Sequence, residues 1–243
     1  MDPKTWSVQA RNLPEHASNP IHTDEGGRAA GFDAALVAGV TVYAYVTRPI
    51  VEAWGPGWLA EGGALVEFLS PVQAGDPVDC VPATPTETGS VEVMALVGGD
   101  ARVRCTAWPG PSVVADRGRP LNEQLEPHVE PLTGGWADYG LRAGDDLDLY
   151  AEAGIVHPAV WPALANGVMT RHLVDGAWIH TRSRIRHHGV ARVGAVATVQ
   201  ATVVDRFDTR SGTRAVLDVT ISADCSLVAT IEHEAIVELY PTG

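Results

Sequence analysis

Basic residues are scarce in this sequence. It holds 17 Lys and Arg against 30 Asp and Glu in 243 residues, a formal net charge of −13. Such a surface repels phosphate backbones and anionic lipid headgroups, so we expect no binding to nucleic acid or membranes. A phosphate-rich ligand would need a local basic patch, and one basic run in the sequence could supply it. The simpler interpretation of that run is a solvated strand edge. That run contains Arg182, Arg184, Arg186, His187, His188 and Arg192.

Cysteines and long apolar stretches are also few. The three cysteines, Cys80, Cys105 and Cys225, form no Cys-x-x-Cys pair, which suits a reducing compartment and argues against a cysteine-bound metal. The longest apolar stretch, residues 34–46, is too short to cross a membrane, and the N-terminus lacks the pattern of a signal peptide. We therefore expect a cytoplasmic protein with no metal ion.

Several motifs that carry chemistry in other enzymes are absent from the sequence. It contains neither of the glycine-rich phosphate-binding patterns and no Gly-x-Ser-x-Gly nucleophile turn. No His-x-x-x-His or Cys/His cluster suggests zinc. The sequence therefore predicts no nucleotide cofactor, and we expect no cofactor of any kind.

The hydrophobic pattern of residues 1–108 predicts a helical region followed by strands. Residues 26–46 have helical spacing, and residues 50–54 extend the helix beyond Pro49. Gly31 and Gly39 are unfavourable inside a helix, and each marks either a break or a close approach of backbones. After Gly55 the period changes to two, which predicts four strands. These are residues 64–68, 78–81, 91–97 and 102–108.

The same plan returns in residues 147–243. A helix is predicted over residues 159–174, and strands are predicted over residues 178–186, 195–206, 213–223 and 226–239. Residues 109–146, punctuated by five prolines, are interpreted as a linker between the two modules. A helix followed by four antiparallel strands, twice, predicts an α+β double hot-dog fold whose two sheets pair within the chain. Pairing would protect two edges that are otherwise exposed.

The most specific stretch is Asn19-Pro20-Ile21-His22, followed by Phe32 and by Gly39 in the predicted helix. Here the sequence resembles the MaoC-like family of hot-dog hydratases and dehydratases, which includes (R)-specific enoyl-CoA hydratases. The resemblance implies a pocket for an acyl-CoA or acyl-carrier thioester. It also implies that His22 and Asn19 are catalytic and that the Gly39 amide polarises the thioester carbonyl.

One position departs from the family pattern. The family carries a catalytic Asp five residues before the His, and this chain has Ala17 there. Hydration of an unsaturated thioester needs a base for the water and an acid for the α-carbon. Glu15 and His16 are candidate replacements, and Asp24 is a further one. In the second module, His157-Pro158 and Asn166-Gly167 occupy comparable places, as structural residues or as part of a composite pocket.

Three functions therefore stay open at the level of sequence. The first is a hydratase or dehydratase with a non-standard base. The second is a subunit that binds an acyl thioester without turnover or supports a catalytic partner, within a homodimer or a heteromeric complex. The third is a thioesterase, for which Asp33 or Glu52 would supply the carboxylate. Fold alone does not separate these activities.

Overall fold

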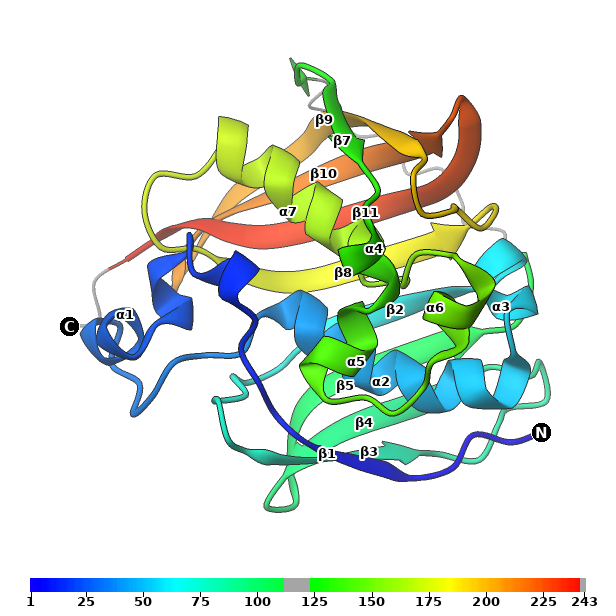
Figure 1. Ribbon diagram of the computed structural model, residues 1–243. Coiled ribbons are helices and arrows are strands. Elements are labelled where there is room, and N and C mark those ends of the chain that lie inside the picture. The colour runs from blue at the N-terminus through cyan, green and yellow to red at the C-terminus, as the bar shows by residue number, and fades with distance from the viewer. Residues whose placement is uncertain (112–122, 241–243) are drawn as a thin grey trace.

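A computed structural model describes residues 1–111 and 123–240 (Figure 1). The first module, residues 1–108, consists of short helical turns, one long helix and five strands. Its elements are β1 (Trp6–Gln9), η1 (Pro14–His16), η2 (Pro20–His22), α1 (Asp24–Ala29), α2 (Gly39–Trp54), α3 (Gly57–Glu61), β2 (Gly63–Phe68), β3 (Pro77–Pro82), β4 (Val91–Val97) and β5 (Asp100–Trp108).

The rest of the chain repeats a long helix followed by four strands, after a connecting segment with short elements of its own. The connecting elements are β6 (Glu123–Gln124), β7 (His128–Pro131), α4 (Gly134–Ala137) and α5 (Tyr139–Ala143). The second module, residues 147–243, contains α6 (Leu149–Ala153), α7 (Val160–His172), β8 (Ile179–His187), β9 (Val196–Thr209), β10 (Gly212–Ala223) and β11 (Ser226–Leu239).

The strands of the described residues form one sheet of 11 strands, in the order β1-β3-β4-β5-β2-β8-β11-β10-β9-β6, with β7 also paired to β9. The two modules join where β2 pairs antiparallel with β8, from Gly63 opposite Arg186 to Glu67 opposite Arg182. The predicted pairing of the two sheets within one chain is therefore confirmed. Helices α2 and α7 lie against the same side of this curved sheet (Figure 1).

Helix α2 is buried on almost every side, from Val40 to Val51. Continuous burial of this kind explains why its sequence shows a broad apolar face rather than a narrow stripe. Pro49 lies inside the helix, and residues 50–54 continue it as predicted. No helix in residues 1–111 or 123–240 is long and apolar enough to cross a membrane.

The break that Gly31 and Gly39 left open within residues 26–46 is present, because two helices with an irregular segment between them occupy this stretch. Helix α1 ends at Ala29, Gly31 has a φ of 88°, and the Phe32 amide donates back to the Gly27 carbonyl. The segment is then held in place by the Asp24 carboxylate, which accepts from the amide of Ala35. A positive φ costs glycine little, which is why the chain turns at this residue.

The connecting segment is more ordered than its prolines suggest. Strand β7 pairs with β9 through His128 opposite Val199, and the side chain of Tyr139 in α5 is fully buried. The segment therefore covers part of both modules, although residues 112–122 lie outside the described residues. Prolines hid these elements, because β7 is a short edge strand that tolerates Pro131 at its end.

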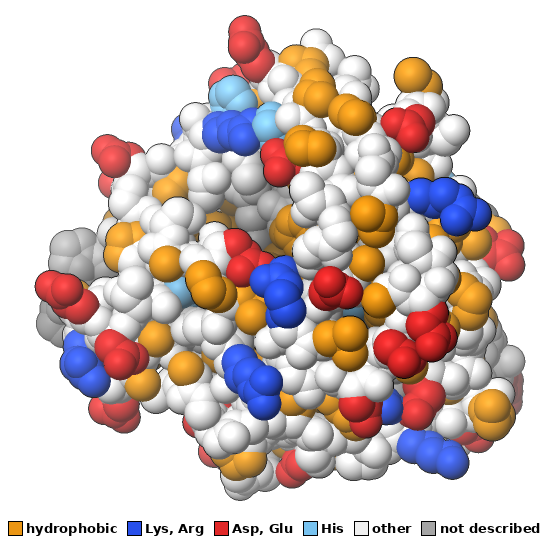
Figure 2. All heavy atoms as spheres, viewed as in Figure 1, with side chains coloured by type: hydrophobic (Ala, Val, Ile, Leu, Met, Phe, Trp, Pro, Cys, Tyr) orange, Lys and Arg blue, Asp and Glu red, His pale blue; other side chains and the backbone are white. Residues whose placement is uncertain are grey.

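Most of the basic run does not lie on a solvated strand edge. Its first four members, up to His187, lie on β8, which is paired on one side with β2 and on the other with β11, whereas His188 and Arg192 are exposed beyond the end of the strand. Arg182 bonds Glu232 and Glu234 at 2.6 and 3.4 Å, and His187 is buried. On the face shown in Figure 2, Lys and Arg side chains are interspersed among acidic ones rather than gathered in one patch.

Candidate functional site

A cavity of about 490 Å³ lies where the first module meets β8 and α7 of the second. Its walls come from the loop before α1, the first turn of α2, the ends of β2 and β8, and one face of α7. Most of the lining is apolar, with polar groups at a few points, which is the usual composition of a small-molecule site. The polar lining residues include Glu15, His16, Asn19, His22, Asn166, His180, Thr181 and Arg214.

The Asn-Pro-Ile-His stretch forms a short turn that presents two side chains to this cavity. Pro20 begins η2, Ile21 is buried beneath it, and Thr23 caps α1 by accepting from the Gly26 amide. The Asn19 side-chain amide donates to the carbonyl of Trp178 at 3.1 Å. Asn19 therefore ties the loop of the first module to the strand entry of the second.

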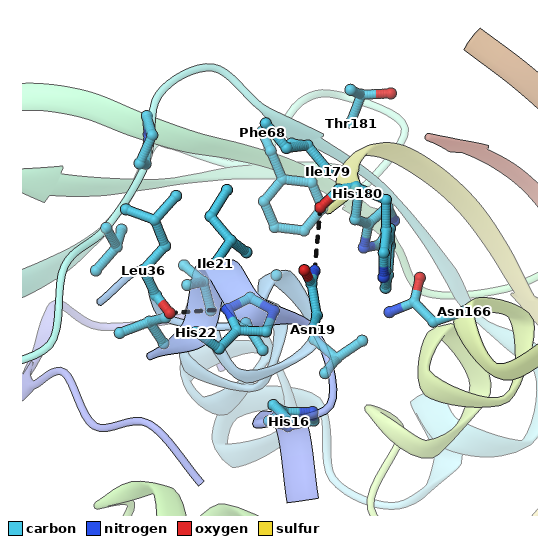
Figure 3. A pocket seen from close by; sticks show the side chains of 18 of the residues that line it. His16, Asn19, Ile21, His22, Leu36, Phe68, Asn166, Ile179, His180 and Thr181 are labelled. Carbon is cyan, nitrogen blue, oxygen red and sulfur yellow. Dashed lines mark hydrogen bonds between the residues drawn. The ribbon is translucent and has the colours of Figure 1, made fainter. Parts of the chain in front are cut away.

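His22 is held in one tautomer by the backbone (Figure 3). Its Nδ1 atom lies 2.8 Å from the Leu36 carbonyl, and because a carbonyl only accepts, Nδ1 carries the proton. The second nitrogen, Nε2, is then an acceptor on a ring that lines the cavity. Burial lowers the pKa of His22 and outweighs the hydrogen bond to Leu36, so the ring is neutral at pH 7.

His16 also lines the cavity, but its Nε2 atom is already engaged. It lies 2.8 Å from the Tyr139 hydroxyl, which in turn lies 2.7 Å from Thr41 Oγ1. Burial lowers the pKa of His16 to about 4, with a further contribution from nearby His22. Glu15 pairs with Arg142 at 2.7 Å. The structure thus brings both predicted replacement groups to the cavity, each with a partner of its own.

No carboxylate takes the place of the missing Asp. Ala17 follows η1, and among the described residues that line the cavity Glu15 is the one carboxylate. Asp24 is engaged with the Ala35 amide. Asp33 and Glu52, the residues expected of a thioesterase, do not line the cavity, and Glu52 forms an ion pair with Arg48.

Gly39 is the first residue of α2 and lies in the cavity wall. The first amides of a helix have no acceptor within the helix, and Ala38 before it has no side chain that could cap them. A β-carbon on Gly39 would lie 3.1 Å from His180 Nδ1 and 3.2 Å from two ring carbons of Phe68. An alanine here would therefore force one of these two side chains to move by a few tenths of an ångström, which glycine avoids.

The sequence did not point to His180, Phe68 or Arg214 as lining residues. His180 lies on β8 and packs against Phe68 of β2, with ring centroids 4.6 Å apart. Nothing in a period-two strand pattern distinguishes His180 from its neighbours. Asn166 and Gly167 of α7, by contrast, were noted in the sequence and do line the cavity. His157 lies outside it, fully buried, with Nδ1 accepting from the Ala159 amide.

The chain was compared with known proteins. The sequence matches no protein-family model and no curated protein. Among solved structures, the Rv0216 protein of Mycobacterium tuberculosis, described as having a double hot-dog fold, matches with a TM-score of 0.68 at 12% identity. The match covers 97% of this chain and 96% of that protein. The chain has a double hot-dog fold.

Other double hot-dog neighbours carry different activities in their names. A MaoC-like dehydratase matches with a TM-score of 0.60 at 14% identity, covering 98% of each chain. An acyl-CoA thioesterase II of Mycobacterium marinum matches with a TM-score of 0.52 at 14% identity, covering 86% of this chain and 93% of the other. At such identities the likeness establishes the double hot-dog fold alone.

Proposed function

We propose that this protein is a MaoC-like hydratase or dehydratase that acts on an acyl-CoA or acyl-carrier thioester. One observation carries the proposal: His22 is fixed as a neutral ring, with Nδ1 bound to the Leu36 carbonyl, in the wall of an apolar cavity beside the start of α2. The double hot-dog fold is shared with a MaoC-like dehydratase, which supports the same assignment.

His22 has the properties that a single acid–base residue needs for this reaction. As water adds to the β-carbon of the enoyl thioester, Nε2 of His22 takes one water proton. The electrons of the double bond move toward the carbonyl and leave an enolate. The protonated ring then returns the proton to the α-carbon, so His22 ends the cycle neutral. Its lowered pKa keeps the ring unprotonated before the reaction and makes its conjugate acid a better proton donor.

Two further residues have supporting roles in this scheme. The free amide of Gly39 at the start of α2 donates to the carbonyl oxygen, where negative charge develops. Asn19 fixes the loop that carries His22 through its bond to the Trp178 carbonyl. Glu15 and His16 are less suited to the base role, because Arg142 and Tyr139 already engage them.

A subunit that binds an acyl thioester without turnover is the second candidate. The specific observation in its favour is Ala17, since no carboxylate faces His22 from that position. Such a subunit would support a catalytic partner, and its homodimeric or heteromeric assembly stays a prediction. A thioesterase was expected to use Asp33 or Glu52 as its carboxylate, and neither residue lines the cavity. The structure therefore offers no support for that hypothesis at these two positions.

Turnover of trans-2-enoyl-CoA separates these candidates. Loss of the enoyl absorbance is followed with a four-carbon and an eight-carbon substrate for the native protein and for His22→Gln. Removal of a general base lowers the rate by about 10² to 10⁴-fold, whereas His172→Gln at the exposed end of α7 is expected to leave it unchanged.

The outcomes lead to different conclusions. Turnover that is lost in His22→Gln and kept in Glu15→Gln and His16→Gln supports the single-residue scheme. Turnover that survives His22→Gln refutes it. Saturable binding of the enoyl-CoA without turnover by the native protein favours the non-catalytic subunit, and Ala17→Asp then becomes the rescue variant.

A further inference from the structure

Strand β8 contains an irregularity where it enters the cavity. Opposite β11, Arg182 pairs with Glu234 and His180 pairs with Ala235, so Thr181 is an extra residue without a partner of its own. The pairing of β8 with β2 also ends at Arg182. A β-bulge of this kind shifts the alternation of side chains by one residue. The sheet therefore opens at this point, where Thr181 lines the cavity.

The bulge places His180 and Ser183 on the same buried face of β8. Two residues three apart in a regular strand point to opposite faces. Here His180 Nε2 lies 2.8 Å from Ser183 Oγ, and Ser183 Oγ lies 2.8 Å from Nδ1 of His233, which is directly opposite on β11. All three side chains are at least nine-tenths buried. They form a continuous hydrogen-bonded row that ends at the cavity.

The cavity end of this row is unpaired. Among the residues that the structure describes, Nδ1 of His180 has no hydrogen-bond partner. Buried polar atoms are rarely left without one, so an orphaned nitrogen in a cavity wall points to a ligand. The same nitrogen lies 3.1 Å from the position of a β-carbon on Gly39. The imidazole and the uncapped first amide of α2 therefore border the same part of the cavity.

We propose that His180 binds the carbonyl oxygen of the thioester through Nδ1, together with the first amide of α2, and that Ser183 and His233 fix the tautomer that makes this possible. The inference rests on the proposed function, because it names a further residue of that same site. It adds a residue of the second module to a site whose recognised motif lies entirely in the first.

The direction of each hydrogen bond follows from the ligand. A carbonyl oxygen only accepts, so Nδ1 of His180 must carry the proton and Nε2 must accept. The single hydroxyl proton of Ser183 then goes to His180, and Ser183 accepts in turn from Nδ1–H of His233. Burial holds both imidazoles neutral: it lowers the pKa of His180 far below its usual range and that of His233 to about 3.

A neutral imidazole is well suited to this task. It donates one directed hydrogen bond to the carbonyl oxygen, and this bond strengthens as the oxygen becomes negative in the transition state. A neutral donor therefore stabilises the transition state more than it stabilises the bound substrate. Asn19 and Asn166 turn their amides toward the same end of the cavity (Figure 3). Their Oδ1 atoms are also buried without partners, so this end of the cavity offers acceptors to a ligand's N–H groups as well.

Two CoA ligands that differ only in the carbonyl test the inference. One is the ketone analogue of hexanoyl-CoA, in which a methylene replaces the sulfur, and the other is the same molecule with a methylene in place of the carbonyl as well. Native protein is expected to bind the ketone at least about tenfold more tightly, since its carbonyl accepts from both His180 and the first amide of α2. His180→Phe is expected to lower that preference to the part that the α2 amide supplies, and Ser183→Ala to lower it by a smaller factor. His188→Gln should keep it, because His188 follows the end of the same strand and is bonded to Thr230.

Nuclear magnetic resonance of ¹⁵N-labelled histidine in the native protein gives a second readout that needs no variant. In the ketone complex, His180 should show a protonated Nδ1 and an unprotonated Nε2, with His233 protonated at Nδ1. An unprotonated Nδ1 on His180 in that complex would overturn the inference.

Failure of the inference is distinguishable from failure of the proposed function. Equal affinity for the two ligands, with hydration of enoyl-CoA still measurable, refutes the role of His180 and leaves the function standing. Binding of neither ligand, with no turnover, overturns both.

Discussion

Replacement of Gly39 by alanine gives the sharpest test of the site geometry. The new β-carbon would lie 3.1 Å from His180 Nδ1 and 3.2 Å from two Phe68 ring carbons. Favourable contacts between heavy atoms need about 3.5 to 4.0 Å, so the neighbours must move by several tenths of an ångström. Neither is free to do so, because Ser183 holds His180 and the Phe68 ring packs against it.

Two opposing terms set the magnitude. Alanine is favoured over glycine in a helix by about 0.5 to 1 kcal/mol, which stabilises the variant. Overpacking in a fixed environment costs about 1 to 3 kcal/mol. We therefore expect Gly39→Ala to lower the free energy of unfolding by about 0 to 2.5 kcal/mol, the difference of those two terms. The methyl group would also separate the carbonyl from His180, so affinity for the ketone analogue of hexanoyl-CoA should fall about tenfold or more.

Gly57→Ala is the matched control, because Gly57 is likewise the first residue of a helix, α3, but is exposed and lies outside the cavity lining. No atom lies within 4 Å of the added β-carbon there. The expected result is a gain of about 0.5 to 1 kcal/mol, with an affinity within a few-fold of the native value. Urea unfolding and calorimetric titration of the ketone measure both quantities. If Gly39→Ala gains as much stability as Gly57→Ala and binds equally well, the inferred contact between Gly39 and His180 is refuted.

Three further substitutions test the surroundings. Among the described residues, neither ring nitrogen of buried His187 has a hydrogen-bond partner, and burial lowers its pKa to about 3. The unfolded chain therefore binds a proton below pH 6.5 that the folded chain does not, so stability is lost as the pH falls from 6.5 toward 3. His187→Phe has no such group to protonate. Between pH 8 and pH 5, its free energy of unfolding in urea titrations should fall by about 1 to 2 kcal/mol less than that of the native protein, and an equal fall would contradict this. Asn19→Asp replaces the donor to the Trp178 carbonyl with an acceptor, which should cost about 1 to 3 kcal/mol and weaken thioester binding; unchanged urea midpoints and affinity would argue against this tie. Tyr139→Phe removes the hydroxyl that bonds His16 and should lower the free energy of unfolding by about 1 kcal/mol. The thermal midpoint should then fall by about 2 to 4 °C, and an unchanged midpoint would show that this bond contributes nothing.

Local patterns in the sequence were sufficient for the general plan of the molecule. The four strands and single long helix of each half follow from spacings of two and of about 3.6 residues, which depend only on near neighbours. The repeat of that plan indicated two modules, and the need to protect sheet edges indicated that their sheets would pair within the chain. Only the structure shows that the pairing strands are β2 and β8. The Asn-Pro-Ile-His stretch indicated the loop that carries Asn19 and His22 to the cavity.

Tertiary structure alone decided how the site is completed. The bulge at Thr181 depends on the register between β8 and β11, and only that register turns His180 and Ser183 to one face. The contact of His180 with Gly39 joins two modules across a long stretch of chain. No local pattern records such a contact, because its energy depends on packing between segments that become neighbours only when the chain folds.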